Sequence, residues 1–535
     1  MLRYAFRLHR WGLVGFATIM VLSPYIQAGA FAQSAGTTAG QRAAFAHEMS
    51  ALAVQLSYLL PAPYRVDTLA GYVQWRAWGT LSVVVSVWAI AAAASAVRGD
   101  EEKQLVDSWL AARVSRPRLV ASRLASFGAA ALVAVVAASL STVLAAARYE
   151  PVSMAGVVGK ALALWLLMVT LFALCSLVAQ LTASLRGAQA AGAGLVVVLY
   201  LCDIVARSQH SLNGLSWVSP FRWYDATDAM APGGHLDVAG VGLSVATILA
   251  AGGLTALAFA RRDLRGPLFS LPIPAATRDV PPSPALAWPV TRLLYRQRWT
   301  LAAWTLITAL VAVFMVALAH GTVESLLSLP GMRAFLTHGS SDPYQGFIAT
   351  FWFGTAELLI AGFAVHLVSG WAADDTEGIL AAVLSTPRHR WAVIAERAGA
   401  AVVGITVVVA VGSLAAAIAS ASLGTSLDAA GVFRASWPLV PFALTFAAAG
   451  AVASTRWPRA AIGVLGVLAF ASFMTADLPP LMNWPGWVAD LSVFQLYGTP
   501  LLTGVFWNGL WAMLAIVAAG FGAATLLMQR REVGP

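Results

Sequence analysis

Long apolar segments of about 20 residues or more recur along this chain of 535 residues. A segment of that length crosses a bilayer as a helix, because a helix satisfies its own backbone hydrogen bonds. The composition agrees, with 59% hydrophobic and 11% charged residues. The alternating pattern of an outer-membrane barrel is absent. We predict an all-α polytopic membrane protein with about 12 transmembrane helices, near 11–32, 71–97, 124–147, 157–182, 188–206, 238–260, 299–320, 347–372, 398–422, 436–454, 460–478 and 503–527.

A charged segment follows the second expected span, at 100–123, and returns after the eighth, at 374–397. Each copy opens with acidic residues and ends with arginines, which suits the helix dipole. Four apolar positions at i, i+1, i+4 and i+5 share one helical face. We predict two short amphipathic helices, each presenting a charged face to the same kind of partner. One constant offset pairs Asp100 with Asp374, Glu101 with Asp375, Leu105 with Ile379, Val106 with Leu380, Trp109 with Val383, Leu110 with Leu384, Arg116 with Arg390 and Arg123 with Arg397.

The expected spans form two halves of six. A proline-rich stretch at 267–290 separates residues 1–266 from 291–535 and is predicted to be a cytoplasmic linker. The first run is interpreted as a span and not as a cleaved signal, because Arg10-Trp11 recurs as Arg298-Trp299. An even number of spans per half requires parallel six-helix repeats. Loop arginines gather on one side, so both termini and both charged segments are expected in the cytoplasm of a multi-pass protein of the plasma (inner) membrane.

A second repeat precedes the last span of each half, on the opposite side. Its two copies, 215–224 and 491–497, pair Ser219 with Ser492, Phe221 with Phe494 and Tyr224 with Tyr497, while Val493 replaces Pro220. One interpretation is an aromatic belt at the membrane interface. The other is a structured outer plug, in which the aromatic rings seal the pathway and the tyrosine hydroxyls lie at a wet rim.

With both repeats placed, the whole chain resembles the permease subunits of ABC-2-type exporters, and in particular the fused two-half permeases of tetronasin-resistance and polyketide-antibiotic exporters. The resemblance implies that the helix after the second span docks on a dimer of separate cytoplasmic ATPase subunits, which bind ATP and Mg. The docking residues would be Asp100, Glu101, Glu102, Leu105, Trp109, Arg116, Asp374, Asp375, Ile379, Leu384 and Arg390. The residues Ser219, Pro220, Phe221, Tyr224, Ser492, Phe494 and Tyr497 would form an outer gate. Thr376 and Gly378 stand where the first copy has Glu102 and Gln104, so the halves are expected to differ.

The chain carries no Gly-x-x-x-x-Gly-Lys-Ser/Thr loop, so a partner is expected to hydrolyse ATP. Its pattern gives no metal site, no cofactor of its own, no catalytic residues and no nucleic-acid binding. Glu357 and Arg76 are charges inside expected spans, where charge is costly. We expect either that they face a central cavity and contact substrate, or that they are structural, as a buried ion pair or as a protonated glutamic acid that holds helices together.

Three functions remain open from the residues. An ATP-driven exporter of hydrophobic or amphipathic compounds explains the duplication and the charged segments. A secondary drug/proton antiporter also has twelve spans, but it usually carries a Gly-x-x-x-Asp-Arg-type loop and more membrane carboxylates. A non-transporting sensor or scaffold leaves the two-half design unexplained.

Overall fold

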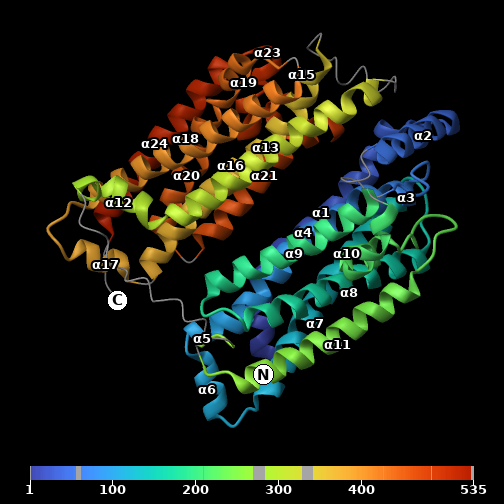
Figure 1. Cartoon of the computed structure of the whole chain (residues 1–535), viewed down its shortest axis with the longest axis horizontal. Helices are drawn as coiled ribbons and strands as arrows, with labels where there is room; N and C mark the ends of the chain where they lie inside the picture. The colour runs from blue at the N-terminus through green and yellow to red at the C-terminus, as the bar shows by residue number, and fades with distance from the viewer. Residues whose placement is uncertain are drawn as a thin grey trace. The chain divides into compact units, whose positions relative to one another are not determined.

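The computed structural model describes the backbone of residues 2–55, 62–208, 210–264, 266–268, 284–327, 342–376, 378–425, 427–458, 460–482 and 485–531. The chain divides into two compact units, Met1–Ala276 and Thr277–Pro535, and each is a bundle of long helices (Figure 1). Most of the predicted linker, 269–283, lies outside the described residues.

The first unit contains α1 (Leu2–Ala35), α2 (Ala39–Gln55), α3 (Leu69–Val73), η1 (Gln74–Trp78), α4 (Gly79–Ala94), η2 (Ser95–Gly99), α5 (Asp100–Glu102), α6 (Leu105–Ala111), α7 (Arg116–Ala146), α8 (Met154–Ala179), α9 (Leu185–Ser208), η3 (His210–Val218), α10 (Pro220–Asp225) and α11 (Val238–Arg261).

The second unit contains η4 (Pro284–Ala287), α12 (Pro289–Arg296), α13 (Arg298–Leu327), α15 (Pro343–Phe347), η5 (Ile348–Trp352), α16 (Phe353–Thr376), α17 (Ile379–Leu384), α18 (Arg390–Leu423), α19 (Ala429–Ser436), α20 (Leu439–Arg456), α21 (Ala461–Met482), η6 (Gly486–Leu491), α22 (Val493–Tyr497), α23 (Pro500–Thr503) and α24 (Trp507–Arg530).

The predicted class, an all-α polytopic membrane protein, is confirmed. Among the described residues, 11 helices are long and apolar enough to cross a membrane, and no strand occurs. The remaining expected span, 460–478, falls on α21, whose described apolar stretch is Gly463–Phe473. The second and eighth spans are continuous helices that run through η1 and η5.

The two units pack their helices in the same way. In the first, α1 lies along α7, while α4 and α11 lie against α8; in the second, α13 lies along α18, while α16 and α24 lie against α20. Small residues allow these close approaches, as they commonly do between membrane helices. A Cβ added at Gly520 of α24 would lie 2.8 Å from the Cβ of Ala448 on α20. The sequence repeat is therefore a repeat of packing as well.

The charged segments are not single helices. In the first unit the second span continues to Glu102, the chain turns, α6 follows, and α7 starts at Arg116. Gln104 at the turn has φ 60°, in the left-handed region that disfavours any residue with a Cβ. Ser115 precedes the first turn of α7 and Pro117 lies inside it, where its missing N–H costs no hydrogen bond. The arginine-rich end of the segment thus belongs to the third span.

Candidate functional site

The short helices α6 and α17 lie at one end of their units (Figure 1). Both start from a left-handed residue, Gln104 with φ 60° and Gly378 with φ 78°, which occupy equivalent positions of the repeat. Val106 and Leu380, also equivalent, are each 3% exposed and fix the apolar face of each helix to its unit. Both short helices exist as predicted, but each is only two turns long or less, and α17 contains apolar residues alone, so the charged face predicted for it is wrong.

The packing around α6 uses the predicted apolar face. Val106 forms a cluster with Leu119 of α7 and Phe259 of α11, and the partly buried Trp109 and Leu110 pack against this cluster. Leu105 is half-buried beside it, as are Ile379 and Leu384 on α17. These apolar residues hold α6 and α17 in place, while Ser108 and its counterpart Ala382 are exposed on the free faces.

The expectation of an exposed acidic face is wrong for Asp100 and Glu101, which are 1% and 4% exposed. Glu101 bridges Arg98 (2.8 Å) and Arg262, the residue that follows α11. Asp100 contacts Arg123 of α7. A buried charge needs a partner, and these contacts join the ends of the second, third and sixth spans. The acidic residues therefore tie the unit together internally.

Glu102 is exposed, but it too has a partner inside the unit. Its Oε1 accepts the backbone N–H of Leu185 at 2.7 Å, at the first residue of α9. The first turn of a helix has free N–H donors and favours negative charge. Glu102 therefore caps the fifth span, and Thr376 at the equivalent position of the second unit has no carboxylate.

The second unit repeats this network in a more open form. Asp375 pairs with Arg531 at 2.7 Å, with side chains 11% and 24% exposed. Asp374 lies 3.9 Å from Arg397 and 3.5 Å from Arg296 of α12. Ala372 stands where the first unit has Arg98. The two acid–arginine networks thus occupy equivalent positions, but the network of the second unit is more exposed to solvent.

Arg116 and Arg390 do the same thing in each unit. The Arg116 guanidinium donates to the carbonyls of Phe259, Ala260 and Arg262 at the end of α11. The Arg390 guanidinium donates to the carbonyls of Met528, Gln529 and Arg531 at the end of α24. The last carbonyls of a helix have no partner within it and attract cations. In each unit, this arginine therefore links the start of the third span to the end of the last span.

The sequence prediction missed Arg98, Arg262 and Arg531. A signal for two of them exists, because Arg261-Arg262-Asp263 and Arg530-Arg531-Glu532 end the last span of each half in the same way. Two arginines at the end of a membrane span are ordinarily interpreted as anchors at the membrane boundary. Nothing in the sequence therefore indicated that they pair with distant carboxylates.

The outer repeat forms two short helices, α10 and α22. Ser219 accepts the N–H of Phe221 and Ser492 accepts that of Phe494, so both serines are N-caps. Pro220 occupies the first turn of α10. Phe494 packs edge-on against Phe442, with ring centroids 5.2 Å apart. The similarity of the two segments in sequence therefore reflects the same serine N-cap at the start of both short helices.

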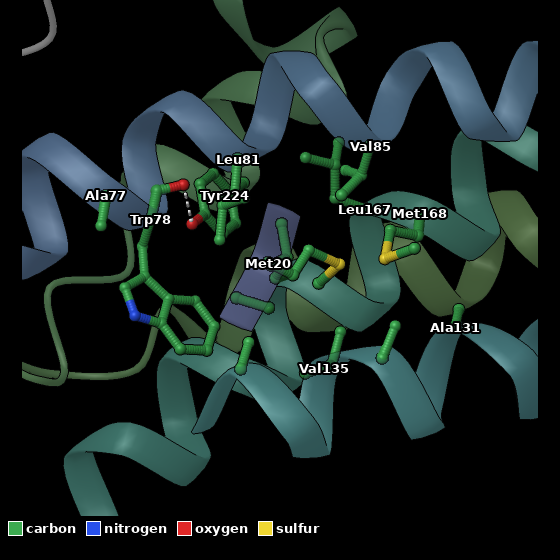
Figure 2. Packing of buried hydrophobic residues seen from close by; sticks show 14 of the residues in the cluster. Met20, Ala77, Trp78, Leu81, Val85, Ala131, Val135, Leu167, Met168 and Tyr224 are labelled. Atoms are coloured by element: carbon green, nitrogen blue, oxygen red, sulfur yellow. Dashed lines mark hydrogen bonds between the residues drawn. The ribbon is translucent and has the colours of Figure 1, made fainter. Parts of the chain in front are cut away.

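The expected wet rim is wrong for the tyrosines. The Tyr224 hydroxyl donates to the carbonyl of Trp78 at 2.8 Å (Figure 2), and that of Tyr497 donates to the carbonyl of Ala435 at 2.9 Å. Burial raises the pKa of both phenols well above the usual range. Phe221 is 2% exposed and packs edge-on against Tyr200 of α9. The helices α10 and α22 are anchored in the core of their own units.

The two intramembrane charges lie in different surroundings. Arg76 is exposed, in the π-helical turn η1, with its guanidinium 5.9 Å from the ring of Trp75. Glu357 is half-buried on α16, and its charge adds to the raised pKa of Tyr497. The structure thus brings Glu357 near α22. Its pairing with Arg76, which belongs to the other unit, stays a prediction.

One repeated feature went unnoticed in the sequence. The π-helical turns η1 and η5 occupy equivalent positions of the second and eighth spans, and each ends at a buried tryptophan, Trp78 or Trp352. Single π turns inside α-helices are uncommon and frequently mark functional sites. Nothing in the hydropathy of a span distinguishes a π turn from an α turn, so only the matched tryptophans offered a signal.

Comparisons with protein families agree with this duplicated geometry. Residues 6–264 match the model of the ABC-2 family transporter protein. Residues 286–529 match the model described as multidrug efflux system permease Rv1217c, C-terminal domain. No curated protein matches the chain. The two models, one of an ABC-2 family transporter and one of a multidrug efflux permease domain, together cover nearly the whole chain. With this coverage and its polytopic all-α fold, the chain belongs to the ABC-2-type permeases.

Proposed function

We propose that the chain is the permease of an ATP-driven exporter that moves hydrophobic or amphipathic compounds, drug-like or lipid-like, out of the cell. A dimer of separate ATPase subunits holds ATP and Mg²⁺ and docks on α6 and α17. Membership of the ABC-2 permeases supports the ATPase partner. The name of the family model that matches the second half, a multidrug efflux permease, supports the substrate class. Clustered arginines favour cytoplasmic termini in the plasma (inner) membrane.

The observation that carries this proposal is the repeated link between each short helix and the last span. Arg116 directly follows the turn after α6, and its guanidinium donates hydrogen bonds to carbonyls at the end of α11. Arg390 donates in the same way to carbonyls at the end of α24. A force applied to α6 or α17 therefore reaches two spans at once, the third by chain continuity and the sixth through the arginine. Such rigid connections are what converts movement of a partner into movement of spans.

The outer helices complete the proposed cycle. α10 is bonded to the second span through the Tyr224 hydroxyl and the Trp78 carbonyl. α22 is bonded to α19 through Tyr497. We infer that each outer helix moves as one piece with the span that holds it, and that the gate opens when these pieces separate. Phe221 and Phe494 keep the pieces rigid by their burial, and the charge of Glu357 acts on Tyr497.

Reconstitution with the cognate ATPase subunit tests the proposal. Proteoliposomes should take up a lipophilic fluorescent dye when ATP is supplied to the ATPase side, and the variant Arg116→Ala/Arg390→Ala should hydrolyse ATP without uptake. Uptake driven by a proton gradient without ATP would instead establish the antiporter. Failure of any ABC ATPase subunit to bind the folded permease would leave the scaffold interpretation.

A further inference from the structure

A cavity of about 120 Å³ lies in the second unit between α12, α17 and the start of α18. Four arginines and two carboxylates line it, which leaves two positive charges in excess: Arg292, Arg296, Arg388 and Arg397 against Asp374 and Glu396. The first unit has a smaller cavity beside α6, of about 40 Å³, which lies among α6, α7, α8 and α11 and has a different lining. The larger cavity has room for a small polar group together with several waters.

Arg397, the buried guanidinium of this cavity, has only distant acceptors among the described residues. Arg397 is 5% exposed, yet its nearest acceptors are the Trp371 carbonyl at 3.4 Å and Asp374 at 3.9 Å. Its counterpart Arg123 contacts Asp100 directly, although the Arg123 Nε has no hydrogen-bond partner among the described residues. An arginine offers five N–H donors, and a buried one normally uses them. The cavity therefore presents spare donors in the geometry that binds planar or tetrahedral oxyanions.

The cavity lies at the level where lipid headgroups sit. Trp299 at the start of α13, Trp391 at the start of α18 and Trp288 before α12 are 77%, 52% and 72% exposed. Tryptophans at the ends of membrane helices mark the membrane–water interface. A Cβ added at Gly399 of α18 would lie 3.1 Å from Val290 of α12, so α12 lies close against the end of this span. The most abundant oxyanion at that level is the phosphate of a phospholipid.

We propose that this cavity binds the phosphate headgroup of an anionic phospholipid, in the leaflet faced by the arginine-rich ends of the spans. The bound phosphate would sit among Arg292, Arg296 and Arg397 and supply the negative charge that Asp374 only partly supplies. The first half differs at the equivalent acidic residues, because Arg98, Arg123 and Arg262 already contact Asp100 and Glu101. Ile379, Leu380 and Val383 of α17 wall the cavity, so occupancy would steady that helix.

The test measures lipid retained by the full chain. Native mass spectrometry and thermal unfolding are recorded in neutral detergent, with added phosphatidylglycerol, phosphatidylcholine or inorganic phosphate. The variant Arg292→Ala/Arg296→Ala removes two exposed arginines of the cavity, and it should fold. Arg298→Ala and Arg118→Ala remove exposed arginines outside the cavity and serve as controls for bulk charge.

We expect retention of one phosphatidylglycerol by the native chain and both controls. The double variant should bind it roughly 10- to 30-fold more weakly, since each arginine near an anionic lipid surface contributes about fivefold. Equal weakening by the controls, or equal retention of phosphatidylcholine, would refute the site. If millimolar inorganic phosphate stabilises the chain as well as the lipid does, the ligand is a soluble anion and the lipid assignment is wrong.

Discussion

Replacing Glu101 by glutamine should strongly destabilise the first unit. The substitution keeps the size of the side chain and removes its charge, which leaves Arg98 and Arg262 buried beside each other; their side chains are 1% and 0% exposed. Loss of one partner from a buried ion pair typically costs about 3–5 kcal/mol. Arg98 still donates to the carbonyls of Ala179 and Gln180, so we expect the lower part of that range.

Asp375→Asn is the matched control in the second unit. Asp375 holds one arginine, Arg531, whose side chain is 24% exposed and can turn to water. Partly exposed pairs contribute about 1 kcal/mol. The two variants remove the same charge at equivalent positions, so their difference isolates the effect of burial.

The assay is the midpoint of thermal unfolding in detergent, followed by tryptophan fluorescence and by recovery of the monodisperse peak. At roughly 2–4 °C per kcal/mol for a domain of this size, Glu101→Gln should lower the midpoint by about 10 °C and Asp375→Asn by about 2–4 °C. Adding Arg98→Ala to Glu101→Gln should recover part of the loss, because one uncompensated charge is removed. Equal shifts in the two single variants, or further loss in the double variant, would refute this reasoning.

Three further predictions concern the repeated arginines, the left-handed turn residues and the Tyr224 hydroxyl. Arg116→Ala and Arg390→Ala should each abolish transport-linked stimulation of ATP hydrolysis while costing roughly 1–3 kcal/mol of stability; unchanged stimulation would show that the grip on the last span is not needed. Gly378→Ala should destabilise α17 by about 1–2 kcal/mol in hydrogen exchange, whereas Gln104→Ala, which replaces one side chain in the left-handed region by another, should change α6 little. Tyr224→Phe should lower the unfolding midpoint by the equivalent of about 1–3 kcal/mol, because the Trp78 carbonyl loses its donor, and an unchanged midpoint would count against this contact.

Hydropathy and internal repetition were sufficient to predict the helical class, most spans and the two short helices. These features depend on periodicity and on the length of apolar runs, which are local in sequence. The constant offset also placed Gln104 and Gly378 correctly as partners, although their left-handed backbone was not foreseen. The shared positive φ could not be predicted, because glutamine, unlike glycine, rarely adopts it.

The direction in which the charged residues point was predicted wrongly. Acidic residues beside a membrane are usually solvated, and no local pattern shows that Glu101 meets Arg262, 161 positions away. The Tyr224 hydroxyl was placed at a wet rim for the same reason, since its acceptor on Trp78 is 146 positions away. Long-range pairing of buried polar groups depends on packing, and packing was not available from a single sequence.

The central claim is that both short helices dock on ATPase subunits, and site-specific photo-cross-linking tests it most directly. A photoreactive residue is placed at Ser108 of α6, at Ala382 of α17, or at Trp487 in η6, which is exposed and serves as the control. With the cognate ATPase present, positions 108 and 382 should each cross-link to an ATPase subunit, and position 487 should not. Absence of cross-links at 108 and 382 in a complex that still hydrolyses ATP would contradict the account.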